Sequence, residues 1–194
     1  MDTSPETGRR TRADAQRNLI TLLDAAKAIF AEAGVDAPVR AIAERAGVGI
    51  GTVYRHFPRR ADLIAAVFRQ EIDACADAAD QLAKTHPPVE ALSLWMRRFV
   101  ELAATKHGLA QALHSGDPAY AALPARRETR LLPAFQALFD AAQATGEIRK
   151  DVASAEFLSA AASLCTSAGA ANPDLAQRLV GLLVDGLRNA AIKA

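Results

Sequence analysis

Three glycines stand at alternate positions in the stretch AGVGIGTVYRHFPRR, residues 46–60, and glycine-rich loops often bind phosphate groups. A dinucleotide site needs the spacing GxGxxG directly after a strand, whereas this stretch has GxGxG after a helical pattern. A nucleotide-binding P-loop needs a glycine followed by lysine and then by serine or threonine, and none of these glycines precedes a lysine. The spacing therefore excludes both kinds of nucleotide site.

The same stretch fits a turn between two short helices. The apolar spacing predicts one helix that ends at Gly47 and a second helix over residues 50–56. Gly47 can adopt the positive φ of such a turn, while Gly49 and Gly51 keep the leading edge of the second helix thin. A helix pair of this kind is a helix-turn-helix, whose second helix enters the major groove of DNA. We therefore interpret residues 38–57 as a DNA-binding motif.

The rest of the chain predicts an all-α fold, since 51% of its residues are apolar, few are aromatic and β-branched runs are nearly absent. Apolar residues at helical spacing predict helices over 14–33, 38–46, 50–56 and 60–85, and later over about 154–170 and 174–191. Pro133 lies inside another helical pattern and should kink or restart it. We expect a flexible basic arm over 1–13, a three-helix DNA-binding domain over 14–60 and a helical regulatory and dimerisation domain over 61–194.

Other residues with catalytic or metal-binding potential lack the arrangement that such chemistry needs. No metal-ligand spacing or carboxylate partner accompanies His86, His107 and His114. The cysteines Cys75 and Cys165 lie far apart in apolar helical segments, which favours buried thiols in a reducing compartment. No secretory signal or membrane-spanning run is present. We expect a soluble cytoplasmic protein that is not an enzyme and needs no cofactor or metal.

Charge gives weak support to a polyanionic partner. The net charge is only +1, but basic residues exceed acidic ones within the first 70 residues and not beyond them. The arginines of the N-terminal arm could lie in a minor groove, or the arm could be an ordinary disordered tail. The sequence leaves this point open.

Three phrases in the first 68 residues carry a family resemblance: AAKAIFAEAG at 25–34, IAERAGV at 42–48 and GTVYRHFP at 51–58. Together they resemble the DNA-binding segment of the tetracycline-repressor-like (TetR/AcrR) family of bacterial transcriptional regulators, and GEIRKDV at 146–152 resembles a phrase of the same family. Ala37 and Gly49 depart from the family pattern, which often has a hydroxyl residue at both positions, and Arg60 replaces a frequent lysine. The resemblance implies a helix-turn-helix domain followed by a helical domain with a small-molecule cavity.

The resemblance also implies a set of residues that contact double-stranded, palindromic operator DNA. Ile50 and Gly51 should face base edges, and the hydroxyls of Thr52 and Tyr54 should reach phosphates or flanking bases. Phosphate contacts are expected from arginines on the flanking helices. The full predicted set is Arg40, Gly49, Ile50, Gly51, Thr52, Tyr54, Arg55, His56, Arg59 and Arg60.

The second domain should bind a small apolar or amphipathic effector and a second copy of the chain. The predicted pocket residues are its largest apolar groups: Trp95, Met96, Phe99, Tyr120, Phe135 and Phe139. Small residues and a leucine stripe near the C-terminus predict a four-helix dimer interface that contains Leu164, Ala168, Leu175, Leu179, Leu182, Leu183 and Gly186. We expect a homodimeric repressor that its effector releases from DNA. The alternatives are a DNA-binding scaffold without an inducer and, less compatible with the apolar stripes, an all-α enzyme.

Overall fold

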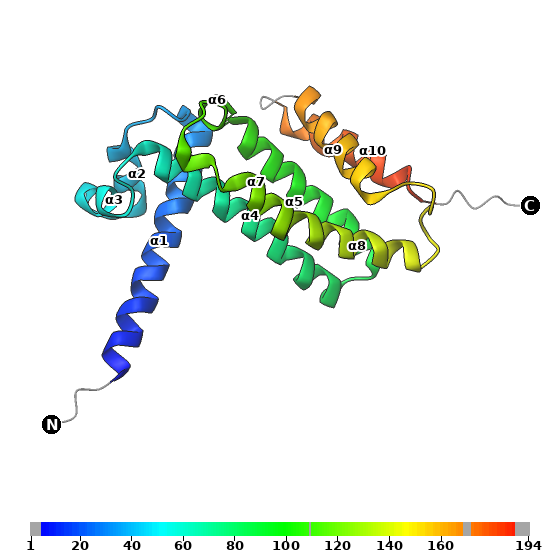
Figure 1. The fold of residues 1–194 in the computed structure, drawn as a ribbon, viewed down its shortest axis with the longest axis horizontal. Coiled ribbons are helices and arrows are strands. Elements are labelled where there is room, and N and C mark those ends of the chain that lie inside the picture. The colour runs from blue at the N-terminus through cyan, green and yellow to red at the C-terminus, as the bar shows by residue number, and fades with distance from the viewer. Residues whose placement is uncertain (1–4, 109, 169–171, 189–194) are drawn as a thin grey trace, which may run out of the picture.

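The computed structural model describes residues 5–108, 110–168 and 172–188, and within these ranges the predicted all-α fold is confirmed. The N-terminal helices form a small lobe at one end of a longer helical bundle, and α4 runs from one into the other (Figure 1). Outside the helices, one isolated antiparallel bridge joins Ile148 to Arg188. None of the described helices is long and apolar enough to cross a membrane.

The small lobe contains α1 (Pro5–Ala33), α2 (Val39–Ala46) and α3 (Ile50–His56), and α4 (Arg60–Thr85) leaves it. The bounds of α2, α3 and α4 agree with the sequence prediction. The prediction of a flexible arm over 1–13 is wrong for residues 5–13, which form the first turns of α1. These turns project away from the rest of the lobe (Figure 1). Their sequence, PETGRRTRA, carries no apolar stripe that could pack against another helix.

The bundle continues with α5 (Pro88–Gly108), α6 (Ala110–Leu113), the 3-10 helix η1 (Pro118–Tyr120), α7 (Leu123–Arg126), the π-helical turn η2 (Arg127–Leu131) and α8 (Leu132–Ala144). The predicted restart at Pro133 is present. The amide of Leu132 donates to the carbonyl of Arg127, as in a π-helix, and Pro133 lies in the first turn of α8. The missing amide of proline costs little at that position.

The last two helices are α9 (Ser154–Ala168) and α10 (Pro173–Asp185). The predicted cap is present, because Asn172 Oδ1 accepts a hydrogen bond from the amide of Leu175 at 3.0 Å. Helix α10 ends at Asp185, earlier than the predicted residue 191. The chain turns there because the carbonyl of Leu187 accepts a 2.8 Å hydrogen bond from the amide of Arg149. Residues 189–191 lie outside the described residues.

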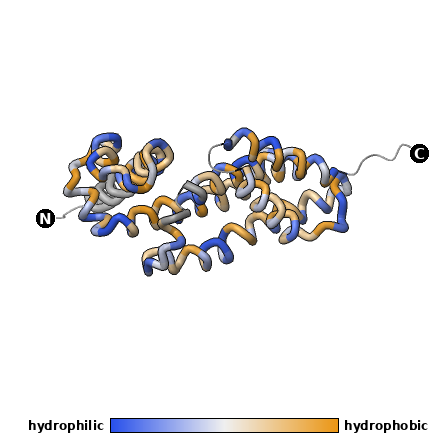
Figure 2. Tube along the Cα trace, turned by 90° about the horizontal axis from the view of Figure 1, so that it is seen from above, coloured by the Kyte–Doolittle hydropathy of each residue, from blue (hydrophilic) through white to orange (hydrophobic). Residues whose placement is uncertain are grey.

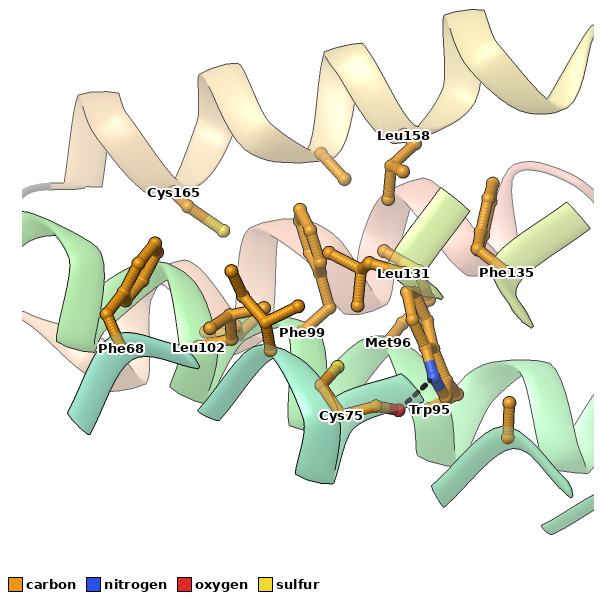
Figure 3. Packing of buried hydrophobic residues seen from close by; sticks show 14 of the residues in the cluster. Phe68, Cys75, Trp95, Met96, Phe99, Leu102, Leu131, Phe135, Leu158 and Cys165 are labelled. Atoms are coloured by element: carbon orange, nitrogen blue, oxygen red, sulfur yellow. Dashed lines mark hydrogen bonds between the residues drawn. The ribbon is translucent and has the colours of Figure 1, made fainter. Parts of the chain in front are cut away.

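Hydrophilic and hydrophobic residues alternate along the helices (Figure 2). Buried hydrophobic residues form a cluster that extends from Leu22 in α1 to Leu187. Trp95 of α5 lies within this cluster and is fully buried. Its Nε1 donates a 2.8 Å hydrogen bond to the carbonyl of Cys75 in α4 (Figure 3). The core therefore joins α4 to the bundle by an apolar contact and a buried hydrogen bond.

Candidate nucleic-acid interface

The turn between α2 and α3 is closed by backbone hydrogen bonds. Gly47 has φ +67°, and its amide donates to the carbonyl of Glu44 at 3.2 Å. The next amide, that of Val48, donates to the carbonyl of Ala43 at 3.0 Å. This pair of bonds is a Schellman motif, which needs a left-handed residue and explains why glycine occupies position 47.

Helix α3 is anchored by one side and exposes the other. Val53 is buried against the core, whereas Ile50 and Tyr54 are 46% and 51% exposed despite their large apolar surfaces. Of the remaining predicted contacts on α3, Gly51, Arg55 and His56 are exposed and Thr52 is partly so. The exposed face carries apolar, hydroxyl and cationic groups, as a surface that binds DNA does.

The two glycines at the start of α3 have open space beside them. A Cβ atom added to Gly49 or Gly51 would meet no other atom within 4 Å, and neither residue has a positive φ. The fold itself therefore does not require glycine at these positions. The bare helix edge leaves room for a molecule that approaches α3 from outside.

The predicted phosphate-binding arginines differ in their surroundings. Arg40 is exposed on α2 and pairs with Glu44, four residues later, at 2.9 Å. Arg59 precedes α4, and its Nη2 lies 2.7 Å from Asp62 Oδ1 while its Nη1 lies 3.4 Å from Asp117 Oδ1. The hydrogen bond from Arg59 lowers the pKa of Asp62, so this carboxylate remains charged beside the arginine.

Arg60 uses one nitrogen of its guanidinium for contacts inside the small lobe. Its Nη1 donates to the carbonyls of Val35 and Ala37, and the side chain is partly buried. The structure thus gives Arg60 internal contacts that the sequence analysis missed.

Sequence reasoning also missed ion pairs that hold the small lobe together. Lys27 of α1 pairs with Glu71 of α4, and Arg45 of α2 pairs with Glu32 of α1 at 2.6 Å. The hydrogen bond from Arg45 lowers the pKa of Glu32. Partners so far apart in sequence leave no local signal. Asp62 was detectable, because an acidic residue three positions after a helix cap accepts a hydrogen bond from the amide of the cap residue, here Arg59.

Comparison with known proteins decides the family. Residues 22–67 match bacterial regulatory proteins of the tetR family, and residues 87–189 match the C-terminal domain of SbtR-like transcriptional regulators. The chain belongs to the TetR family. It is a DNA-binding transcriptional regulator rather than an enzyme.

Two solved TetR-family structures resemble nearly the whole chain. The regulator SCO0520 from Streptomyces coelicolor is 40% identical, covers 88% of this chain and 98% of its own, and has a TM-score of 0.76. A TetR regulatory protein from Mycobacterium vanbaalenii is 38% identical over 92% of this chain and 99% of its own, with a TM-score of 0.74. The repressor KstR of Mycolicibacterium smegmatis is 44% identical over 62 residues, and this match spans only 30% of each chain.

The predicted effector-pocket residues of this TetR-family chain are all buried, and most belong to one row of aromatic rings. Trp95 lies 5.8 Å from Phe99 and 5.2 Å from Phe135, whose ring lies 5.6 Å from that of Phe139. Phe157 of α9, which the prediction omitted, also contacts this row. Tyr120 instead packs from η1 near the start of α4, and burial raises the pKa of its hydroxyl.

Of the predicted dimer residues, Leu182 and Gly186 are exposed, whereas the others are partly buried, and Leu164, Ala168 and Leu183 pack against the core. Ala176, Val180 and Val184 bury the inner side of α10, whereas Leu182 is 68% exposed. A surface groove of about 320 Å³ lies between the two helices, and Leu182, Leu183 and Gly186 contribute to its lining. None of the predicted effector-pocket residues lines it. Leu182 and Gly186 thus leave part of this face open to solvent.

Proposed function

We propose that this TetR-family regulator is a cytoplasmic homodimeric repressor that binds a palindromic operator and leaves it when a small apolar or amphipathic effector binds. The bare leading edge of α3 carries this proposal. Ile50 and Tyr54 are exposed beside two glycines that the fold does not need. Such exposed apolar surface is unfavourable when nothing covers it. It is well suited to a helix that must approach DNA bases closely.

We assign the DNA contacts on α3 by chemical type. Ile50 suits contact with a thymine methyl group, and Gly51 keeps the helix backbone close to the base edges. Thr52 and Tyr54 offer hydroxyls, and Arg55 and His56 offer cationic or hydrogen-bonding groups, to phosphates or flanking bases. Arg40 and the half-exposed Arg59 are the flanking phosphate contacts.

We assign dimerisation to α9 and α10. A two-fold axis would place the exposed leucines of one copy against those of the other and form a four-helix bundle. In such a dimer the two α3 helices would enter successive major grooves, about 34 Å apart along the DNA. The exposed apolar face of α10 supports this assembly.

We assign effector binding to the aromatic row between α5, α8 and α9. Because these rings pack on one another, an effector that inserts between them would displace some of them. Trp95 touches both Phe135 and the carbonyl of Cys75 in α4, so such a movement would reach α4. An effector releases DNA only if it binds the rearranged state more tightly than the DNA-bound state.

The decisive experiment selects the bound sequence from random duplexes and measures its affinity at several salt concentrations. We expect a palindrome with half-sites about one helical turn apart. Arg40→Ala should weaken binding to operator and scrambled DNA alike, and flatten the salt slope of the dimer by about 1.8, because each phosphate contact contributes about 0.9. Gly51→Leu should leave the slope unchanged and remove the preference for operator. Selection that yields no palindrome would overturn the proposal.

A thermal-shift screen separates an effector-responsive repressor from a scaffold. Fatty acids, acyl thioesters, sterols and amphipathic drugs serve as probes, and a specific ligand raises the melting temperature in proportion to the logarithm of its concentration. The same compound should release labelled operator. Phe99→Trp should abolish both effects while operator binding without ligand is retained. If none of these classes shifts the melting temperature, the scaffold alternative stands.

A further inference from the structure

The side chain of Arg60 joins two points on either side of the helix-turn-helix. Arg60 is the first residue of α4, immediately after the segment that follows α3. Its Nη1 donates to the carbonyl of Val35 and, at 2.8 Å, to the carbonyl of Ala37, both in the loop that precedes α2. One guanidinium nitrogen therefore connects the chain entering the motif to the chain leaving it.

The loop that Arg60 holds has few other means of keeping its shape. Gly34 ends α1 with φ +79°, and the amide of Ala37 returns to the carbonyl of Gly34 at 3.2 Å. Pro38 precedes α2 without an amide hydrogen and without a side-chain cap. Ala37 itself is buried. Two hydrogen bonds from a charged donor are a large share of the contacts that fix this loop.

The neighbouring arginine points to a different set of partners. Arg59 pairs with Asp62 in its own helix and with Asp117 in the bundle, whereas Arg60 contacts only carbonyls of the small lobe among the partners the structure records. A phosphate contact by Nη1 of Arg60 would break bonds that satisfy two carbonyls in a partly buried loop. The two consecutive arginines therefore have separate roles.

We propose that Arg60 is a positioning residue for operator recognition: it clamps the entry and exit of the helix-turn-helix and fixes α3 relative to α4 without contacting DNA. This proposal rests on the proposed role of α3 as the recognition helix. Non-specific DNA binding depends on phosphate contacts and tolerates a small change in the orientation of α3. Base readout by two helices in successive grooves does not tolerate it.

The test measures DNA affinity across a series of salt concentrations, on the selected operator and on scrambled duplexes. It compares Arg60→Lys and Arg60→Met with the matched variants Arg40→Lys and Arg40→Ala. Lysine keeps the charge, which suffices for a phosphate contact, but its side chain is shorter than that of arginine, so its nitrogen falls short of the position between the two carbonyls that Nη1 occupies. We expect Arg60→Lys to lose about ten- to hundredfold in operator affinity with little change on scrambled DNA and no change in salt slope. Arg40→Lys should retain operator affinity.

Hydrogen exchange on the free protein gives a second measurement that needs no DNA. In both Arg60 variants the amides of residues 34–48 should exchange faster, while those of α5 and α8 should not. If the wild-type protein selects no operator, the proposed function fails but the exchange result still tests the clamp.

Four results would overturn the proposal. The first is full operator affinity in Arg60→Lys, and the second is a salt slope flattened by about 1.8 in Arg60→Met with equal losses of affinity for operator and scrambled DNA. The third is unchanged hydrogen exchange of residues 34–48, and the fourth is loss of the whole fold in both variants. The first two would make Arg60 a phosphate contact. The third would remove the clamp, and the fourth would give Arg60 a role in global stability instead.

Discussion

Leu182 offers the sharpest test of the proposed dimer, because it is large, apolar and 68% exposed on α10. Complete burial of a leucine side chain stabilises by about 1.5–3 kcal/mol, so burying the exposed two thirds would contribute about 1–2 kcal/mol per copy. A two-fold interface buries two copies and gains about 2–4 kcal/mol. Leu182→Glu should remove this gain and also place a charge in the interface. The dissociation constant of the dimer should rise by about 30- to 1000-fold or more.

The assay is sedimentation equilibrium over a wide concentration range, with thermal unfolding of each variant in parallel. Ile20→Glu is the matched control, because Ile20 is 45% exposed on α1, far along the chain from α9 and α10. The control should remain dimeric. Leu182→Glu should remain folded and lose only the stabilisation that dimerisation adds, since an exposed side chain contributes little to the folding of a single copy. Unchanged association in Leu182→Glu, or equal dissociation in Ile20→Glu, would refute the assignment.

Three further predictions concern the fold. Phe135→Ala should lower the free energy of unfolding, measured in urea titrations, by about 3–5 kcal/mol, because Phe135 is buried among aromatic rings. A loss below about 1 kcal/mol would show that these rings pack loosely. Burial raises the pKa of the Cys75 thiol to about 12, so a thiol reagent at pH 8 should modify it only when the protein unfolds. Arg149 lowers the pKa of Asp151 from 3.8 to about 2. The pair therefore stabilises the fold above pH 3.8 and loses this effect as the pH falls through 2. Asp151→Asn should remove this pH dependence from acid unfolding curves.

Local signals were sufficient to predict the elements of the DNA-binding motif. Glycine at the end of α2, proline after α3 and the apolar spacing of α4 are properties of a few neighbouring residues, and the structure places the helix ends where they predicted. The cap at Asn172 belongs to the same class. The outward position of Ile50 and Tyr54 followed from the motif and agrees with their exposure.

Contacts between distant segments could not be predicted in the same way. The sequence marks Arg60 as a cation at a helix start, but its hydrogen bonds to the carbonyls of Val35 and Ala37 depend on how α1 meets α4. The ion pair of Asp73 with Arg126 joins residues 53 positions apart for the same reason. Phe157 joined the aromatic row because α9 packs across α5 and α8. Such contacts depend on packing in three dimensions rather than on spacing along the chain.

These long-range contacts make α4 the element on which both lobes act. On the bundle side, Arg126 forms a bidentate pair with Asp73 at 2.6 Å, and Arg130 pairs with Asp77 one turn further along α4. The π-helical turn η2 contains Arg130, directly follows Arg126 and leads into α8, which carries Phe135. A shift of α8 that made room for an effector would therefore pull on α4 through these pairs and through the hydrogen bond of Trp95. We infer that the start of α4 would pass this displacement to the helix-turn-helix through Arg60, because a helix transmits axial movement along its length better than a loop does.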